Sequence, residues 1–345
     1  MKKILLASTA IIGLGFFAGS ALAAESKVTV GGSVDFQAGF FDDEADATGN
    51  DRDFRNNTEV HVKADIKADN GLEYGASIEI ESNSGAANSA LDYDEAYLYV
   101  QGSWGRIEAG DQDGVVYQMS IYAPVVGIGQ LDGDQYDWLS DGTLGAYPFF
   151  VDLQDNTKIS YFSPRVVGFQ VGVSYSPELD QGDSIVRTGA TRLAAGESND
   201  IFEAVLNYNG EFSGVTVEGS AGLLTANGDN ATAAGSEFTS WNAGLRLGYA
   251  GFQVGGGYAD FDEAAAADGA EDAWNVGVAY TAGNFGVAAN YAYVDYDTDG
   301  VNQYALGGTY TVAPGLSVNA DFVYADNEVT NNDGSVLILG TKLAF

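Results

Sequence analysis

The stretch Thr58-Glu59-Val60-His61-Val62-Lys63-Ala64-Asp65-Ile66-Lys67-Ala68 alternates polar and apolar side chains without interruption from Glu59 onward. Successive side chains of a β-strand point to opposite faces, so the apolar residues from Val60 to Ile66 share one face and the charged residues share the other. The same period recurs at Val28–Ala38, at Leu72–Glu81 and through most of the chain after residue 238. Because no amphipathic helical segment of useful length accompanies these strands, the sequence predicts an all-β protein.

The connections between the strands fall into two sets. We count sixteen strand candidates, which start near residues 27, 55, 71, 93, 105, 157, 168, 201, 215, 238, 251, 273, 284, 301, 315 and 335. Odd-numbered connections are mostly long and polar: Asp42–Phe54, Asn83–Asp92, Gln112–Asn156, Pro177–Asp200, Asn227–Glu237, Glu263–Asp272, Asp297–Gly300 and Asn327–Gly334. Even-numbered connections are short and turn-like, as at Asp69-Asn70 and Ala250-Gly251. This alternation is typical of an up-and-down antiparallel barrel, whereas a Greek-key sandwich gives no reason for it.

Aromatic residues favour a membrane around this barrel. On single apolar faces Trp241 is followed by Tyr249, and Trp274 is followed by Tyr280. Such gaps of six to eight residues span roughly 20–26 Å at ~3.3 Å per residue. A tilt of ~40° reduces this to roughly 15–20 Å of height, the scale of an apolar band between two aromatic girdles. The competing interpretation is that they are ordinary aromatic residues of a soluble sheet.

The composition excludes several functional classes. The chain has no Cys, which excludes disulfides, thiolate zinc sites and cysteine catalysis. The formal charge of −35 argues against nucleic acid as a partner, because phosphates need a basic face. With 46% hydrophobic and 12% aromatic residues, the chain is not a disordered acidic segment. His61 is the one histidine, and no serine nucleophile motif accompanies it, so we expect it to line a surface and expect no enzyme activity.

The first 23 residues read as a cleaved signal peptide. Lys2 and Lys3 precede an apolar core, and Ala21-Leu22-Ala23 is a small-residue cleavage site. We therefore expect residues 1–23 to be removed on export and residues 24–345 to form the barrel. The mature chain would keep 49 Asp and Glu and 12 Lys and Arg, a formal charge of 12 − 49 = −37.

Several stretches resemble the Gram-negative general porins, most closely the sixteen-stranded trimeric type of alphaproteobacteria. They are Tyr97–Gly110, Thr157–Pro164 with the following Gly168–Gly172, and the terminal Leu339-Gly340-Thr341-Lys342-Leu343-Ala344-Phe345. The resemblance implies a homotrimer in the bacterial outer membrane, in contact with lipopolysaccharide, that passes small hydrophilic solutes by passive diffusion. It also implies that the third connection, residues 112–156, folds into the lumen as a constriction loop. The Pro-Glu-Phe-Gly-type tip of enteric porins is missing there, so that subfamily's constriction residues cannot be transferred.

Charged residues give the candidate pore site. The third connection holds no Lys or Arg but carries an acidic set: Asp113, Asp132, Asp134, Asp137, Asp141, Asp152 and Asp155. The candidate wall cations are Arg52, Arg55, Lys63, Arg106, Lys158 and Arg246. Acidic groups facing wall cations would set up a transverse field, and an excess of carboxylates favours cations, so we expect weak cation selectivity. The alternatives are an acidic loop on the outer surface and a substrate-selective channel of the same fold.

One acidic run resembles the opening of a calcium loop. Asp295, Asp297 and Asp299 have the spacing of an EF-hand, but its twelfth position would be Leu306 rather than Glu, so an EF-hand is rejected. An ad hoc calcium site in the outer loops stays open, because clustered carboxylates repel one another. We expect no required cofactor. Two further classes, an outer-membrane enzyme and a secreted acidic adhesin, remain as distant competitors.

Overall fold

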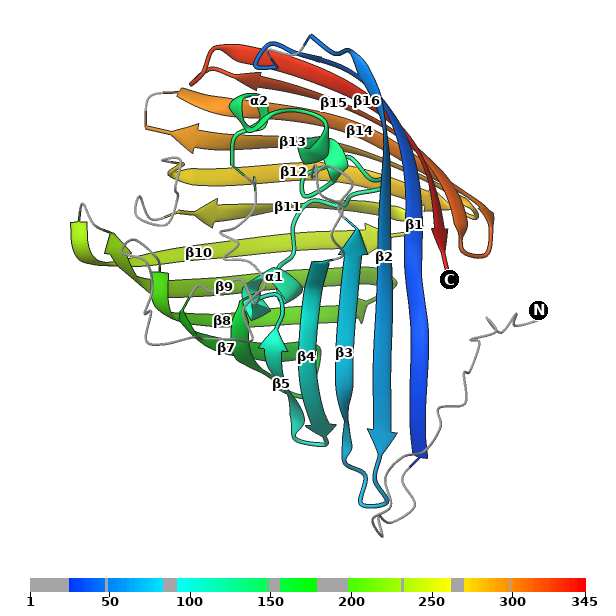
Figure 1. Ribbon diagram of the computed structural model, residues 1–345, viewed down its shortest axis with the longest axis vertical. Helices are drawn as coiled ribbons and strands as arrows, with labels where there is room; N and C mark the ends of the chain where they lie inside the picture. The colour runs from blue at the N-terminus through cyan, green and yellow to red at the C-terminus, as the bar shows by residue number, and fades with distance from the viewer. Residues whose placement is uncertain are drawn as a thin grey trace.

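The computed structural model describes residues 25–46, 49–82, 92–146, 148, 156–178, 198–230, 233–261, 270–297 and 299–345. Its strands form one closed antiparallel barrel in which each strand pairs with its sequence neighbours and β1 pairs with β16 (Figure 1). The strands are β1 (Glu25–Asp43), β2 (Arg52–Lys67), β3 (Glu73–Ser82), β4 (Asp92–Gly102), β5 (Gly105–Asp111), β6 (Thr157–Phe162), β7 (Phe169–Glu178), β8 (Ser198–Phe212), β9 (Val215–Asn230), β10 (Ala233–Tyr249), β11 (Phe252–Asp260), β12 (Asp272–Ala282), β13 (Phe285–Tyr296), β14 (Asp299–Ala313), β15 (Leu316–Asn327) and β16 (Asn332–Ala344). The prediction of a sixteen-stranded barrel is confirmed.

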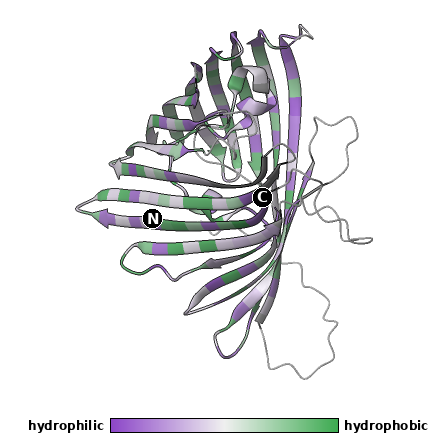
Figure 2. Cartoon of the chain, turned by 90° about the vertical axis from the view of Figure 1, so that its left-hand side faces the viewer, coloured by the Kyte–Doolittle hydropathy of each residue, from purple (hydrophilic) through white to green (hydrophobic). Residues whose placement is uncertain are grey.

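The predicted alternation separates an apolar outside from a polar inside. Along β12, Trp274, Val276 and Val278 are exposed on the outer face, while Asn275 on the inner face is only 3% exposed. Bands of apolar and polar residues alternate along the strands in Figure 2. Exposed apolar side chains all round a barrel are what a lipid-facing surface requires.

The aromatic residues lie in two rows on this outer surface. One row runs across β10–β15, with ring centroids 5.2 Å apart for Trp241 and Tyr258 and 4.9 Å apart for Tyr291 and Tyr304. Near the other end of the strands, Phe252 packs against Tyr280 at 4.4 Å. The two rows match the predicted girdles.

The tight turns gather at one end of the barrel. At Ser213-Gly214 and at Ala250-Gly251 both residues have positive φ, the conformation that a two-residue hairpin with native twist demands. At this end the carboxyl-terminal Phe345 also exchanges backbone hydrogen bonds of 3.0 and 3.1 Å with Gly32 of β1. The terminal residue therefore completes the seam between β16 and β1.

One predicted connection is shorter than we expected. Residues 227–237 read as a long polar loop, but β9 continues to Asn230 and β10 already begins at Ala233. The backbone of these residues pairs across the two strands, for example Asn227 with Glu237. Polar residues can extend a hairpin beyond the apolar band because backbone pairing, rather than lipid contact, holds them.

The third connection folds into the barrel, as predicted. It contains α1 (Val115–Met119), the 3-10 helix η1 (Asp134–Asp137) and α2 (Asp141–Leu144), with α1 and α2 inside the curve of the strands (Figure 1). Its apolar residues make a small core against the inner wall, where Trp138, Leu139 and Leu144 pack with Val336 and Ile338. Among the described residues no helix is long and apolar enough to span a membrane.

Candidate functional site

Amide side chains on the inner wall hold the third connection in place. On β12, Asn275 accepts a hydrogen bond from the backbone N–H of Ala123 at 2.8 Å and donates one to the carbonyl of Pro148 at 2.9 Å. We call the residues that make such contacts the wall amides: Gln37, Asn207, Asn242, Asn275, Asn290 and Gln303. Because they come from strands all round one side of the barrel, they fix the loop along the wall instead of across the opening.

Glycines let the loop approach that wall closely. A Cβ at Gly244 of β10 would lie 1.5 Å from the carbonyl oxygen of Ile121, and one at Gly39 of β1 would lie 2.2 Å from the ring of Trp138. No side chain fits at either distance, so the backbone of the strand itself forms the surface on which the loop lies.

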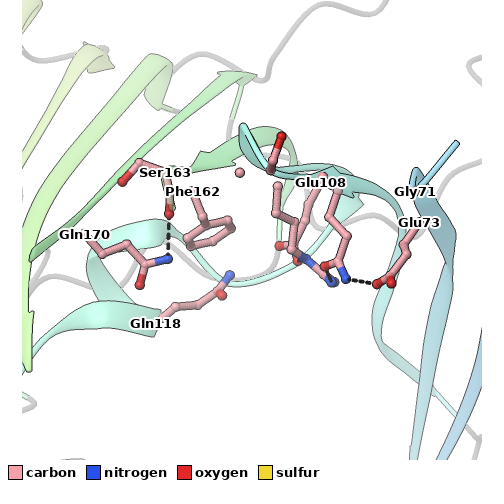
Figure 3. A pocket seen from close by; sticks show the side chains of 12 residues that line it. Gly71, Glu73, Glu108, Gln118, Phe162, Ser163 and Gln170 are labelled. Atoms are coloured by element: carbon pink, nitrogen blue, oxygen red, sulfur yellow. Dashed lines mark hydrogen bonds and ion pairs between the residues drawn. The ribbon is translucent and has the colours of Figure 1, made fainter. Parts of the chain in front are cut away.

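A polar cavity of about 580 Å³ remains beside the loop at the tight-turn end of the barrel. Glu73 and Gln170 lie on opposite sides of it, with Phe162 and Gln118 of α1 between them (Figure 3). Arg106 and Glu108 also line it. A hydrated space bordered by carboxylate, guanidinium and amide groups suits small polar solutes.

The structure describes five of the seven predicted acidic residues. The carboxylate of Asp137 lies 3.1 Å from the guanidinium of Arg55, one of the predicted wall cations. Asp132 accepts a hydrogen bond from the hydroxyl of Tyr117 at 2.8 Å within the loop itself. The backbone N–H of Asp113 lies 3.3 Å from the carboxylate of Glu95. Asp141 lies in α2, while Asp152 and Asp155 lie outside the described residues.

Asp134 faces the wall instead of the open lumen. Its carboxylate accepts a hydrogen bond from Gln37, which also interacts with Asp35 of the same strand. Burial is the main reason that the pKa of Asp134 is raised to about 6; Asp35 and Asp137 raise it further, against the hydrogen bond from Gln37. The docked loop therefore contains a carboxyl group that holds its proton more tightly than a free aspartate does.

The six predicted wall cations differ in what they contact. Lys63 and Arg106 both lie near the ring of Tyr99, at 5.5 and 4.0 Å from its centroid, and Arg106 also contacts Glu108. Arg55 pairs with Asp137 and lies over Trp138. Arg106 lines the polar cavity, and Arg55 and Lys63 lie on the inner face of β2.

The other three cations have different surroundings. Lys158 is buried and donates to the carbonyl of Gln112. Arg246 donates to the carbonyl of Tyr122 at 3.0 Å and lies 3.6 Å from Glu218. Arg52 is 73% exposed beside Asp51 at the end of β2 that carries the long connections. Lys158 and Arg246 thus bind the backbone of the third connection, a role that the sequence analysis did not assign to them.

A group of side chains on the lumen wall lies close enough together to hold a metal ion. Within the described part of the chain, the one group of three side chains whose ligand atoms all lie within 4.8 Å of one another is Glu59, His61 and Glu79. The predicted calcium residues Asp295, Asp297 and Asp299 surround the turn between β13 and β14 and do not form such a group. A calcium site there stays a prediction.

Sequence reasoning did not identify the wall amides as site residues. Asn and Gln recur on the inner faces of β8–β14, but a solvated lumen and a docked loop both accept them there. The repeated Asn and Gln at inward positions were the only sequence signal for these contacts. The path of the third connection shows that they bind the loop.

The comparisons with known proteins agree with this geometry. A family model described as Gram-negative porin matches residues 7–330. An uncharacterized protein of Rickettsia prowazekii is 23% identical over 274 residues, covering 60% of this chain and 61% of that protein. One of Rickettsia typhi is 24% identical over 217 residues, covering 52% and 48%. The chain thus spans about half to three fifths of the length of these curated relatives.

Two solved structures share the fold. A variant of the Rh. blastica porin has a TM-score of 0.65 at 15% identity, with 92% of this chain and all of that one covered. The anion-selective porin from Comamonas acidovorans has a TM-score of 0.66 at 15% identity, with 93% of this chain and 100% of that one covered.

Proposed function

Because the chain belongs to the Gram-negative porin family, we propose that it forms a water-filled channel through which small hydrophilic solutes cross the outer membrane by passive diffusion. The observation that carries this proposal is the position of the third connection. It lies along one side of the lumen, held by the wall amides, and leaves a polar cavity beside Glu73, Arg106 and Gln118. Such a path needs neither a reaction nor energy coupling, because a solute moves through the water of the lumen down its own concentration gradient.

We also propose a weak preference for cations. The chain carries a formal charge of −35, and its wall cations are largely compensated. Arg55, Arg106 and Arg246 lie beside Asp137, Glu108 and Glu218, and Lys158 is buried against a loop carbonyl. The carboxylates in excess raise the local concentration of cations. The Comamonas porin is named as anion-selective. Its sequence is only 15% identical to this chain, so its selectivity does not carry over to this protein.

Swelling of liposomes tests the proposal of passive diffusion. Vesicles containing the purified protein should swell in neutral sugars at rates that fall steadily as solute size increases and that rise linearly with solute concentration. Saturation by one solute, with exclusion of others of equal size, would favour the substrate-selective channel. No swelling in any solute would overturn both.

We also propose how the protein assembles. We expect a homotrimer in contact with lipopolysaccharide, formed after removal of residues 1–23, which lie outside the described part of the chain. Native mass spectrometry of the outer-membrane protein should give three copies, each starting at Ala24.

Thermal melting with and without a chelator tests the proposed calcium site at Asp295, Asp297 and Asp299, since equal melting temperatures would argue against a bound ion.

A further inference from the structure

His61 lies between two carboxylates on the lumen wall. It pairs directly across the strands with Glu79 of β3, and Glu59 precedes it by two residues on the same face of β2. Its Nε2 atom is 2.6 Å from a carboxylate oxygen of Glu59, and its Nδ1 atom is 2.8 Å from one of Glu79. This face of β2 also carries Arg55, which reaches the third connection, so it faces the lumen.

The three side chains offer the ligand types that divalent metals bind. A neutral histidine ring presents a nitrogen, and each glutamate presents carboxylate oxygens. Because a carboxylate lies beside each ring nitrogen, an ion bound to the ring has oxygen ligands from both glutamates nearby.

The spacing suits a small divalent ion. The ligand atoms of Glu59, His61 and Glu79 all lie within 4.8 Å of one another, and bonds of roughly 2.0–2.2 Å to one ion bring ligands to about 3.3 Å apart. Rotation of the glutamate side chains supplies the difference. The side chains are 37% exposed for His61, 29% for Glu59 and 19% for Glu79, so water in the lumen can reach the ion and complete its coordination.

The ligand types select the metal. Imidazole nitrogen with carboxylate oxygens is a common set for zinc, whereas calcium takes six to eight oxygen ligands. Lys63, the next lumen-facing residue of β2, lies 3.7 Å from Asp65 and so contributes its charge further along the wall. The two glutamates therefore provide the negative charge that a divalent ion needs.

We propose that Glu59, His61 and Glu79 form a lumenal binding site for a zinc-class divalent ion. The binding stands on the geometry of β2 and β3 alone. Its effect on the channel rests on the proposed function: the ion adds positive charge and bulk to the wall of the open lumen, so it lowers the current of permeating cations.

Calorimetric titration of the purified, detergent-solubilised protein with Zn²⁺ tests the site directly. The native chain should bind one ion per protomer in a saturable step that excess Ca²⁺ does not displace. His61→Asn and Glu79→Gln should each weaken that step by at least about tenfold, because even the loss of a group that only supports a metal ligand typically costs that much affinity. Asp69→Asn, which removes one carboxylate at the exposed turn of the same hairpin, should bind as the native chain does.

Equal binding by the native protein and His61→Asn would overturn the site, as would the absence of a saturable step. Glu79→Gln retains the histidine, so it keeps the test valid if His61→Asn fails to fold. In a planar bilayer, micromolar Zn²⁺ should lower the single-channel current of the native protein and of Asp69→Asn but leave that of His61→Asn unchanged; an equal block of all three would contradict the proposal. Zinc binding by a protein that forms no channels would refute the proposed function and leave the site intact.

Discussion

Arg55 is the residue at which the wall and the third connection meet through opposite charges. Its guanidinium lies 3.1 Å from Asp137, and both side chains are partly exposed, 34% and 56%. An ion pair this open contributes only about 0–1 kcal/mol to stability. Its effect should therefore appear in permeation rather than in folding.

Replacing Arg55 by Gln should shift the reversal potential in a salt gradient toward stronger cation preference, because a positive charge leaves the inner wall beside the third connection. Asp137→Asn should shift it the opposite way. Arg52→Gln is the matched control, since the same charge is lost from a side chain that is 73% exposed at the rim. A shift for Arg52→Gln equal to that for Arg55→Gln would contradict a local role for the pair.

Asp134 should make the docking of the loop depend on pH. Its pKa is raised to about 6 from the ordinary 3.8, mainly by burial. The docked loop therefore binds this proton more tightly than a free loop does, so docking is strongest below about pH 4 and weakens as the pH rises toward about 6. Open-channel current noise should increase over that interval, and Asp134→Asn should remove most of the increase. Noise that instead fell with rising pH would contradict this sign.

At the scale of the elements, the third connection keeps its position only if its backbone can lie directly against strand β10. A Cβ at Gly244 would lie 1.5 Å from the carbonyl oxygen of Ile121, so Gly244→Ala should push the loop off the wall at a cost of about 1–3 kcal/mol. We expect altered single-channel conductance and faster proteolysis within the loop. Gly219→Ala on β9 is the control, because its nearest neighbour would be 3.6 Å away. Equal behaviour of the two variants would place the loop elsewhere.

The strands were predictable because each carries its own signal. Alternation along Thr58–Ala68 and the short turn at Ala250-Gly251 are local features, and both appear where the sequence indicates them. The path of the third connection is not local. Nothing at Asn275 or Gly244 distinguishes a loop contact from a lining position until residues more than a hundred positions apart come together. Lys158 and Arg246 were therefore grouped with pore cations, although both bind loop carbonyls.

At the scale of the whole molecule, the acidic excess has an ordered distribution. Exposed outer positions such as Trp274, Val276 and Leu306 are apolar, so the charges lie in the long connections and on the inner face. A barrel divided in this way needs only every second residue apolar to face lipid, which accounts for the modest mean hydropathy of −0.06. The negative lumen that results is the basis of the proposed cation preference.

The reversal potential of the native protein in a planar bilayer, under a tenfold gradient of potassium chloride, tests that preference most directly. We expect stable open channels and a potential of the sign given by potassium passing faster than chloride, but well short of the value for an ideally selective pore. A potential of the opposite sign, or a membrane without conductance, would contradict it.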